Sequence, residues 1–221
     1  MPVSGGSLNS TLSLFAGAVL VCAVTVLWLS AVRGVVRVIA VQGLALGAVA
    51  ATLGFHAHDG GLVATAVVVV AIKGVVIPLL LRRLGSADAT AREQRPLINV
   101  PASLVVSAVL ILLAFSSTRV VAQVVGGTPG SLVPIGFATL LVGFLVLVTR
   151  RRPIFQIVGL LLVDNGIALV AFLVTAGVPF LIELGVTLDV LLGVVVLMVL
   201  AERLRHEFGD VDLDELQELH D

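Results

Sequence analysis

The chain has 221 residues, of which 59% are hydrophobic and 12% charged, and its mean hydropathy is +1.19. Soluble domains contain roughly 45–50% apolar and about 25% charged residues, so this composition excludes a soluble globular domain, a nucleic-acid-binding protein and a disordered chain. The net charge of −1 implies no polyanionic partner. We therefore expect an all-α, polytopic membrane protein with little mass outside the lipid bilayer.

The cysteine content indicates that the chain carries no redox centre. Its one cysteine, Cys22, cannot form an internal disulfide or supply the grouped thiolates of an iron–sulfur or structural zinc site. We therefore expect no cofactor on this chain. The first ten residues contain no basic side chain, so we also expect that the first apolar helix is retained rather than cleaved as a signal peptide.

Seven apolar stretches are long enough to cross the roughly 30 Å hydrocarbon core of a bilayer as helices. Their apolar runs are continuous, which excludes an outer-membrane barrel built from short alternating strands. The seven predicted spans are Thr11–Ala31, Gly34–Phe55, Gly61–Leu81, Pro101–Val124, Ser131–Thr149, Pro153–Ala176 and Pro179–Ala201.

Basic residues between the predicted spans indicate the orientation. With seven spans they gather on one face, and the opposite face holds only Arg119. By the positive-inside rule this predicts an external N-terminus, a cytoplasmic C-terminus and a multi-pass protein of the cell's inner (plasma) membrane. The cytoplasmic basic residues are Arg33, Arg37, Arg82, Arg83, Arg92, Arg95, Arg150, Arg151, Arg152, Arg203 and Arg205.

The two halves of the chain resemble each other loosely. In each half a basic turn precedes a helix with an internal polar residue, Gln42 in the first and Asp164 followed by Asn165 in the second. This pattern suggests two three-helix units joined by a linker. The predicted segments are a first unit with its cytoplasmic loop (1–100), a linker helix and outer loop (101–130), a second unit (131–201) and a cytoplasmic tail (202–221).

Besides Arg37 and Arg119 near the ends of their spans, four ionisable residues lie inside the predicted spans, where a charge at the helix centre costs roughly 2.5–3.5 kcal/mol on insertion scales. Asp164 and Asp189 lie near the middles of the sixth and seventh spans, Glu183 lies one turn into the seventh, and Lys73 lies within the third. Two midplane carboxylates that face one lysine leave an excess negative charge, and such a cluster should hold a proton. These residues are therefore candidates for a proton pathway.

Each candidate also has a structural interpretation. Lys73 can extend toward the headgroups, and Glu183 can be an ordinary outer-interface residue. The two aspartates can form a static ion pair with Lys73 that only fixes helix packing. His56 and His58, in a short outer loop, are expected to be solvated rather than metal-binding.

The helix around Lys73 is expected to be irregular. Pro78 has no backbone N–H, so the carbonyl of Gly74 loses its usual helical partner beside the lysine. An ordinary proline kink is the alternative. On the second span, the spacing of Gly43 and Gly47 predicts close packing against another helix.

Several stretches resemble the hydrogenase-4 component E family over nearly the whole chain. They are AIKGVVIPLLLRRL, RRPIFQIVGLLLVDNGIALVAFLV, PFLIELGVTLDVLLGVVVLMVLAERL and the tail GDVDLDELQELHD. Members of that family are membrane-arm subunits of formate hydrogenlyase-type group 4 nickel–iron hydrogenase complexes. The last three predicted helices are also similar to the K-type membrane subunit of complex I and to the C-type component of multisubunit sodium/proton antiporters.

The likeness to the K-type subunit of complex I assigns counterparts to individual residues. Asp189 falls on the glutamate of the last helix, and Asn165 falls on the asparagine of the middle helix. The middle-helix glutamate aligns near Leu161, one turn from Asp164. This sequence also has aspartate in the Asp164–Asn165 pair, where the family usually has glutamate.

The resemblance implies a non-catalytic, accessory subunit of an oxidoreductase complex that takes part in proton translocation. It implies antiporter-like and H-type membrane partners, as in complex I, and peripheral hydrogenase and iron–sulfur subunits. The alternatives are a subunit of a multisubunit cation/proton antiporter and a scaffold with static ion pairs. The residues expected to pass protons laterally are Lys73, Asp164, Glu183 and Asp189, with Gln42 and Asn165 as neutral hydrogen-bonding positions.

Overall fold

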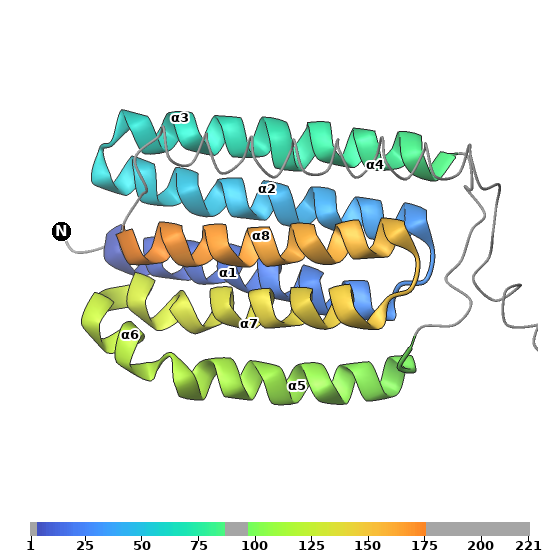
Figure 1. Cartoon of the computed structure of the whole chain (residues 1–221). Helices are drawn as coiled ribbons and strands as arrows, with labels where there is room; N and C mark the ends of the chain where they lie inside the picture. Colours follow the sequence, from blue (N-terminus) through green and yellow to red (C-terminus); the bar gives the residue numbers. More distant parts are fainter. Residues whose placement is uncertain (1–3, 87–96, 176–221) are drawn as a thin grey trace, which may run out of the picture.

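The computed structural model describes residues 4–86 and 97–175, and within these ranges the chain is helical and contains no strand (Figure 1). Six helical segments there are long and apolar enough to cross a membrane, which confirms the prediction of an all-α membrane protein. The elements are α1 (Ser4–Trp28), α2 (Val32–Ala57), α3 (Gly60–Val69), the π-helix η1 (Val70–Val76), α4 (Ile77–Ser86), α5 (Val100–Ser117), α6 (Arg119–Val125), α7 (Gly127–Thr149) and α8 (Pro153–Thr175).

The six described spanning segments coincide with the first six predicted spans, except that the fourth is shorter than expected. The predicted span Pro101–Val124 is divided at Thr118 into α5 and the short α6. The hydroxyl of Thr118 donates to the Ala114 carbonyl (2.6 Å), and Ser117 bonds to carbonyls of the same turn. Such bonds slightly destabilise and often bend a helix, and a count of apolar residues does not detect a break of this kind.

The seventh predicted span, Pro179–Ala201, lies outside the described residues, and with it Glu183 and Asp189. The seven-span count, the orientation of the termini and the division into two three-helix units therefore stay predictions. In the described part, basic residues do gather at one end of the bundle. The start of α2 with Arg33, the end of α4 with Arg83 and the α7–α8 turn with Arg151 lie at this end, and Arg119 begins α6 near the other end (Figure 1). We call the first of these the basic end.

The helices form an ordered bundle in which α8 is central. In Figure 1, α2 and α8 lie side by side, with α3 and α4 beyond α2 and with α7 and then α5 beyond α8. Helix α1 packs against both α2 and α7. Helix α8 is the most enclosed of the described spanning segments and α5 the least. Residues of α8 are therefore those best placed to meet side chains from several helices.

Glycines allow α7 and α8 to approach closely. A Cβ atom added at Gly143 would lie 2.6 Å from the Val163 nitrogen, and one added at Gly166 would lie 2.5 Å from the Leu140 nitrogen. Gly136 and Gly159 are equally confined by the facing helix. Small residues at membrane helix interfaces act in this way, because they let backbones pack without intervening side chains.

We predict that Gly166→Ala destabilises the bundle by about 1–3 kcal/mol, because the added methyl must displace the backbone of α7. Thermal unfolding in detergent measures this loss. Gly17→Ala is the matched control, since a Cβ at Gly17 on α1 meets no atom within 4 Å. Equal melting temperatures for the two variants would contradict the packing described here.

Candidate functional site

A buried ion pair joins the third and sixth spans at mid-bundle. The Nζ atom of Lys73 lies 2.6 Å from Oδ2 of Asp164, and the two side chains are only 3% and 6% exposed. Asp164 is equally far from both ends of α8, and Lys73 is equally far from Gly60 and Ser86. The two charges therefore meet at the same depth. The alternative in which Lys73 extends to the headgroups is wrong for this structure.

Both charged groups retain hydrogen-bonding capacity. In the described part of the chain, neither Lys73 Nζ nor Asp164 Oδ2 has a hydrogen-bond partner beyond the ion pair. An ammonium carries three hydrogens, and a carboxylate oxygen accepts more than one hydrogen bond. The pair is therefore chemically able to take a further polar partner on either side.

The turn that carries Lys73 is wider than an α-helical turn. Residues Val70–Val76 form a π-helix, and the N–H of Ile77 donates to the carbonyl of Ile72, five residues earlier. The irregularity that Pro78 predicts is thus present, directly before the proline. Short π-helical segments within α-helices are rare and are often found at functional sites.

Two glycines of α2 make room for this wide turn. A Cβ atom at Gly43 would lie 2.5 Å from the backbone carbonyl carbon and oxygen of Lys73. A Cβ at Gly47 would overlap the side chain of Val70. The predicted close packing of the Gly43–Gly47 pair is confirmed, and its partner is the π-helix itself.

A chain of amide hydrogen bonds lies beside the ion pair. Nδ2 of Asn165 donates to Oε1 of Gln42 (2.9 Å), and Nε2 of Gln42 donates to the Val19 carbonyl (2.9 Å). Gln42 is fully buried, and Asn165 follows Asp164 on α8. These two bonds connect α8 to α2 and α2 to α1, so they fix the rotation of α8 that turns Asp164 toward Lys73.

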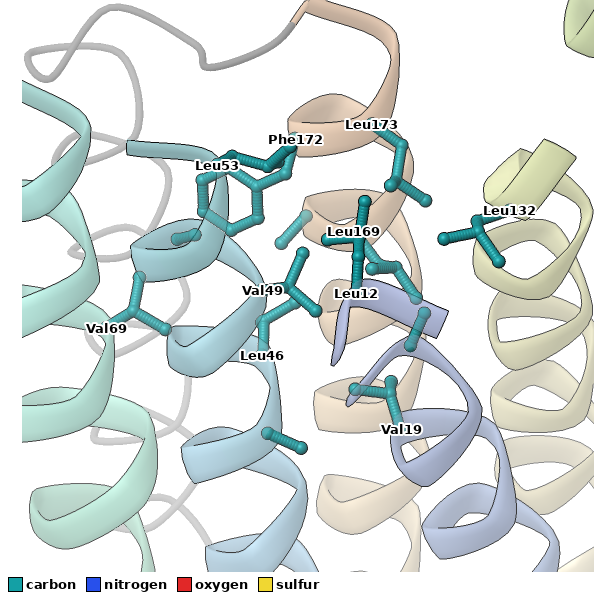
Figure 2. Close-up of a cluster of buried hydrophobic side chains, with 14 of the residues drawn as sticks. Leu12, Val19, Leu46, Val49, Leu53, Val69, Leu132, Leu169, Phe172 and Leu173 are labelled. Atoms are coloured by element: carbon teal, nitrogen blue, oxygen red, sulfur yellow. The ribbon is translucent and has the colours of Figure 1, made fainter. Parts of the chain in front are cut away.

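The polar residues lie between two clusters of buried apolar side chains. Figure 2 shows the cluster on the side away from the basic end, where Leu46 and Val49 of α2 meet Leu169 and Phe172 of α8. The second cluster, toward the basic end, includes Ile39 of α2. Polar groups enclosed by apolar walls interact more strongly with each other than in water. We call Gln42, Lys73, Asp164 and Asn165 the polar layer.

The structure thus brings together four of the six predicted site residues, and Glu183 and Asp189 lie outside the described ranges. His56 and His58 are exposed at the end of α2. In residues 4–86 and 97–175 no group of three or more histidine, cysteine, aspartate or glutamate side chains is placed to hold a metal.

A further buried charge, not expected from the sequence, is Arg150, which is 4% exposed. Its guanidinium donates to the carbonyls of Leu27 (2.6 Å) and Val26 (3.4 Å) and lies 5.5 Å from the ring centre of Phe155. A cation at the carbonyl end of α1 is favourable, because the last carbonyls of a helix lack backbone donors. The three consecutive arginines Arg150–Arg152 give no sequence signal that predicts which of their side chains is buried.

Comparison with known proteins gives one full-length relative. The chain is 41% identical over 220 residues to Uncharacterized protein Rv0085 of Mycobacterium tuberculosis (strain ATCC 25618 / H37Rv), a match that covers 99% of this chain and 100% of that protein. No protein-family model matches the chain, and no solved structure matches it.

Proposed function

We propose that this chain, which belongs to the same family as Uncharacterized protein Rv0085, is a non-catalytic membrane subunit that passes protons through its polar layer. The observation that carries the proposal is the buried pair of Lys73 and Asp164 at mid-bundle. Ionisable residues at membrane depth are costly, so they are by default functional candidates. The resemblance to hydrogenase-4 component E supports a membrane arm of a hydrogenase complex related to complex I as the assembly.

The geometry of the pair suits proton exchange. At 2.6 Å, a proton on Lys73 Nζ can move to Asp164 Oδ2, which converts two charges into two neutral groups without displacing either helix. For a proton to move on, one member of the pair must then meet another donor or acceptor. In the proposal that further partner is Glu183 or Asp189 of the predicted seventh span.

Gln42 and Asn165 have a positioning role in this proposal. Amide groups do not exchange protons readily near neutral pH, but they hold α8 at a fixed rotation through the bonds to α2 and α1. That rotation sets the distance between the carboxylate of Asp164 and the ammonium of Lys73. The chain itself contributes no cofactor in this proposal, and electron transfer takes place on peripheral iron–sulfur and hydrogenase subunits.

The proposal includes the finer topology. Seven spans in the inner (plasma) membrane place the basic end in the cytoplasm, the N-terminus outside and the C-terminus in the cytoplasm. A reporter fused after Asp221 should then be active only on the cytoplasmic side, and one inserted beside His58 only on the external side. The reverse labelling, or the same side for both reporters, would remove the seven-span arrangement.

Purification in mild detergent tests the proposed assembly. If the proposal is correct, a tag on this chain should recover antiporter-like membrane subunits together with peripheral hydrogenase and iron–sulfur subunits. Recovery of antiporter subunits without any peripheral redox protein would favour the cation/proton antiporter instead. The Lys73→Met and Asp164→Asn variants should recover the same partners, because the proposal assigns these residues to transport.

A further inference from the structure

An apolar groove lies between α1 and α5 on the outside of the bundle, with a volume of about 360 Å³. Apart from the indole N–H of Trp28, the one polar group in its wall is the Thr25 hydroxyl, which donates to the Val21 carbonyl (2.7 Å) and is thereby satisfied within α1. The rest of the wall is apolar. Its other lining residues include Val24 and Trp28 of α1 and Leu104 and Ile111 of α5.

One end of the groove is formed by Trp28, the last residue of α1, which lies at the basic end. The groove is lined by the last turns of α1, and the Leu27 carbonyl there accepts a hydrogen bond from Arg150. The residues that lead into α5 are held at the same end, because the Leu97 N–H donates to the Thr149 carbonyl (3.0 Å). Two exposed arginines follow these residues in the sequence: Arg33, at the start of α2, follows the end of α1, and Arg151, in the α7–α8 turn, follows Arg150. Basic residues therefore lie at the same end of the bundle as the Trp28 end of this apolar groove.

We propose that this groove holds an acyl chain of an anionic phospholipid whose phosphate lies beside Arg33 and Arg151. Trp28 is 70% exposed at the end of α1, which is the depth at which indole rings meet lipid headgroups. Basic side chains near a membrane surface attract anionic lipids. Apart from the Trp28 indole and the satisfied Thr25 hydroxyl, the wall offers only apolar side chains, and an acyl chain, which needs no hydrogen bond, fits such a wall. The inference does not depend on proton transfer at Lys73.

Intrinsic fluorescence reports directly on this site, because Trp28 is the only tryptophan and the chain contains no tyrosine. The full chain is purified in mild detergent and reconstituted in phosphatidylcholine vesicles, so that Trp28 supplies the whole indole signal. Brominated phosphatidylglycerol or brominated phosphatidylcholine is then titrated in. We expect brominated phosphatidylglycerol to quench Trp28 with an apparent affinity about five-fold higher or more, and salt to reduce that preference.

Two pairs of variants separate the groove from the general lipid surface. Val24→Phe fills the groove and should remove the preference, whereas Val105→Phe, on an exposed part of α5 outside the groove, should not. The double change Arg33→Gln with Arg151→Gln should lower the preference about five-fold or more. Arg119→Gln removes a charge from the other end of the bundle and should leave it unchanged.

Three results would each overturn the inference. The first is equal quenching by the two brominated lipids. The second is a preference that survives both Val24→Phe and the double arginine change. The third is a Trp28 that neither lipid quenches, which would show that protein covers the groove.

Discussion

Under the proposed function, replacing Asp164 with asparagine should abolish proton translocation while the complex still assembles and its redox half-reactions continue. The amide keeps the size of the side chain but cannot take the proton of Lys73, 2.6 Å away. Lys73→Met should have the same effect, because it removes the other member of the exchanging pair. The same loss is expected for Asp189→Asn in the predicted seventh span. Proton uptake into vesicles, measured beside hydrogenase activity, separates transport from electron transfer.

A static scaffold predicts the opposite pattern for the same variants. Removing one partner of a buried ion pair leaves an uncompensated charge, which costs about 3–5 kcal/mol and should impair assembly. The double variant Lys73→Met with Asp164→Asn leaves no charge unpaired, so a scaffold should regain assembly and function. If the residues form a proton relay, the double variant should not regain proton transport. Asp59→Asn is the control carboxylate, since Asp59 is exposed and caps α3 through a bond to the Gly61 N–H that asparagine can also accept.

Substituting Gly43 with alanine should have the second-largest effect, because its neighbour is the backbone that carries Lys73. A methyl group there would lie 2.5 Å from the Lys73 carbonyl, and neither backbone can yield without moving the π-helix. We expect a loss of about 1–3 kcal/mol in stability, and a fall in transport that exceeds what the stability loss explains. Unfolding temperature and vesicle proton uptake measure the two effects.

Two other glycines give a graded series for this test. At Gly74 an added Cβ would meet Leu44 Cδ2 at 3.0 Å, a side-chain tip that can rotate, so Gly74→Ala should be milder. Gly17→Ala should be neutral, since no atom lies within 4 Å. If transport fell equally in all three variants, or in none, the contact between Gly43 and the π-helix would have no functional weight.

The spanning helices are predictable because their lengths follow from the bilayer alone. The pairing of Lys73 with Asp164 can also be predicted from the sequence, because opposite charges at equal depth in hydrocarbon attract each other strongly. The hydrogen bond between Gln42 and Asn165 is harder to predict from the sequence. Helices that are apolar all round offer no amphipathic face, so the sequence does not say which side turns inward.

Two other features depend on local polar competition that hydropathy does not measure. Helix α5 ends before Thr118, whose hydroxyl bonds to the Ala114 carbonyl, and Arg150 folds back onto the end of α1. In each feature a hydroxyl or guanidinium group donates a hydrogen bond to a specific backbone carbonyl. The position of those carbonyls is known only once the helices are packed.

The π-helix also determines which residues beyond it face the protein. Buried positions along this span include Val69, Lys73, Ile77 and Leu81, which follow at steps of four residues, and Thr65 and Gly74 are buried beside them. In a regular α-helix three such steps would rotate the stripe by about 120°, which would carry Leu81 away from the bundle. The wider π-helical turn contains one residue more than an α-helical turn, and this extra residue absorbs the excess rotation. Deleting Val75 should therefore remove the extra residue of the wide turn and leave Leu81 facing inward, whereas the same deletion within α2 would turn everything beyond it by about 100°.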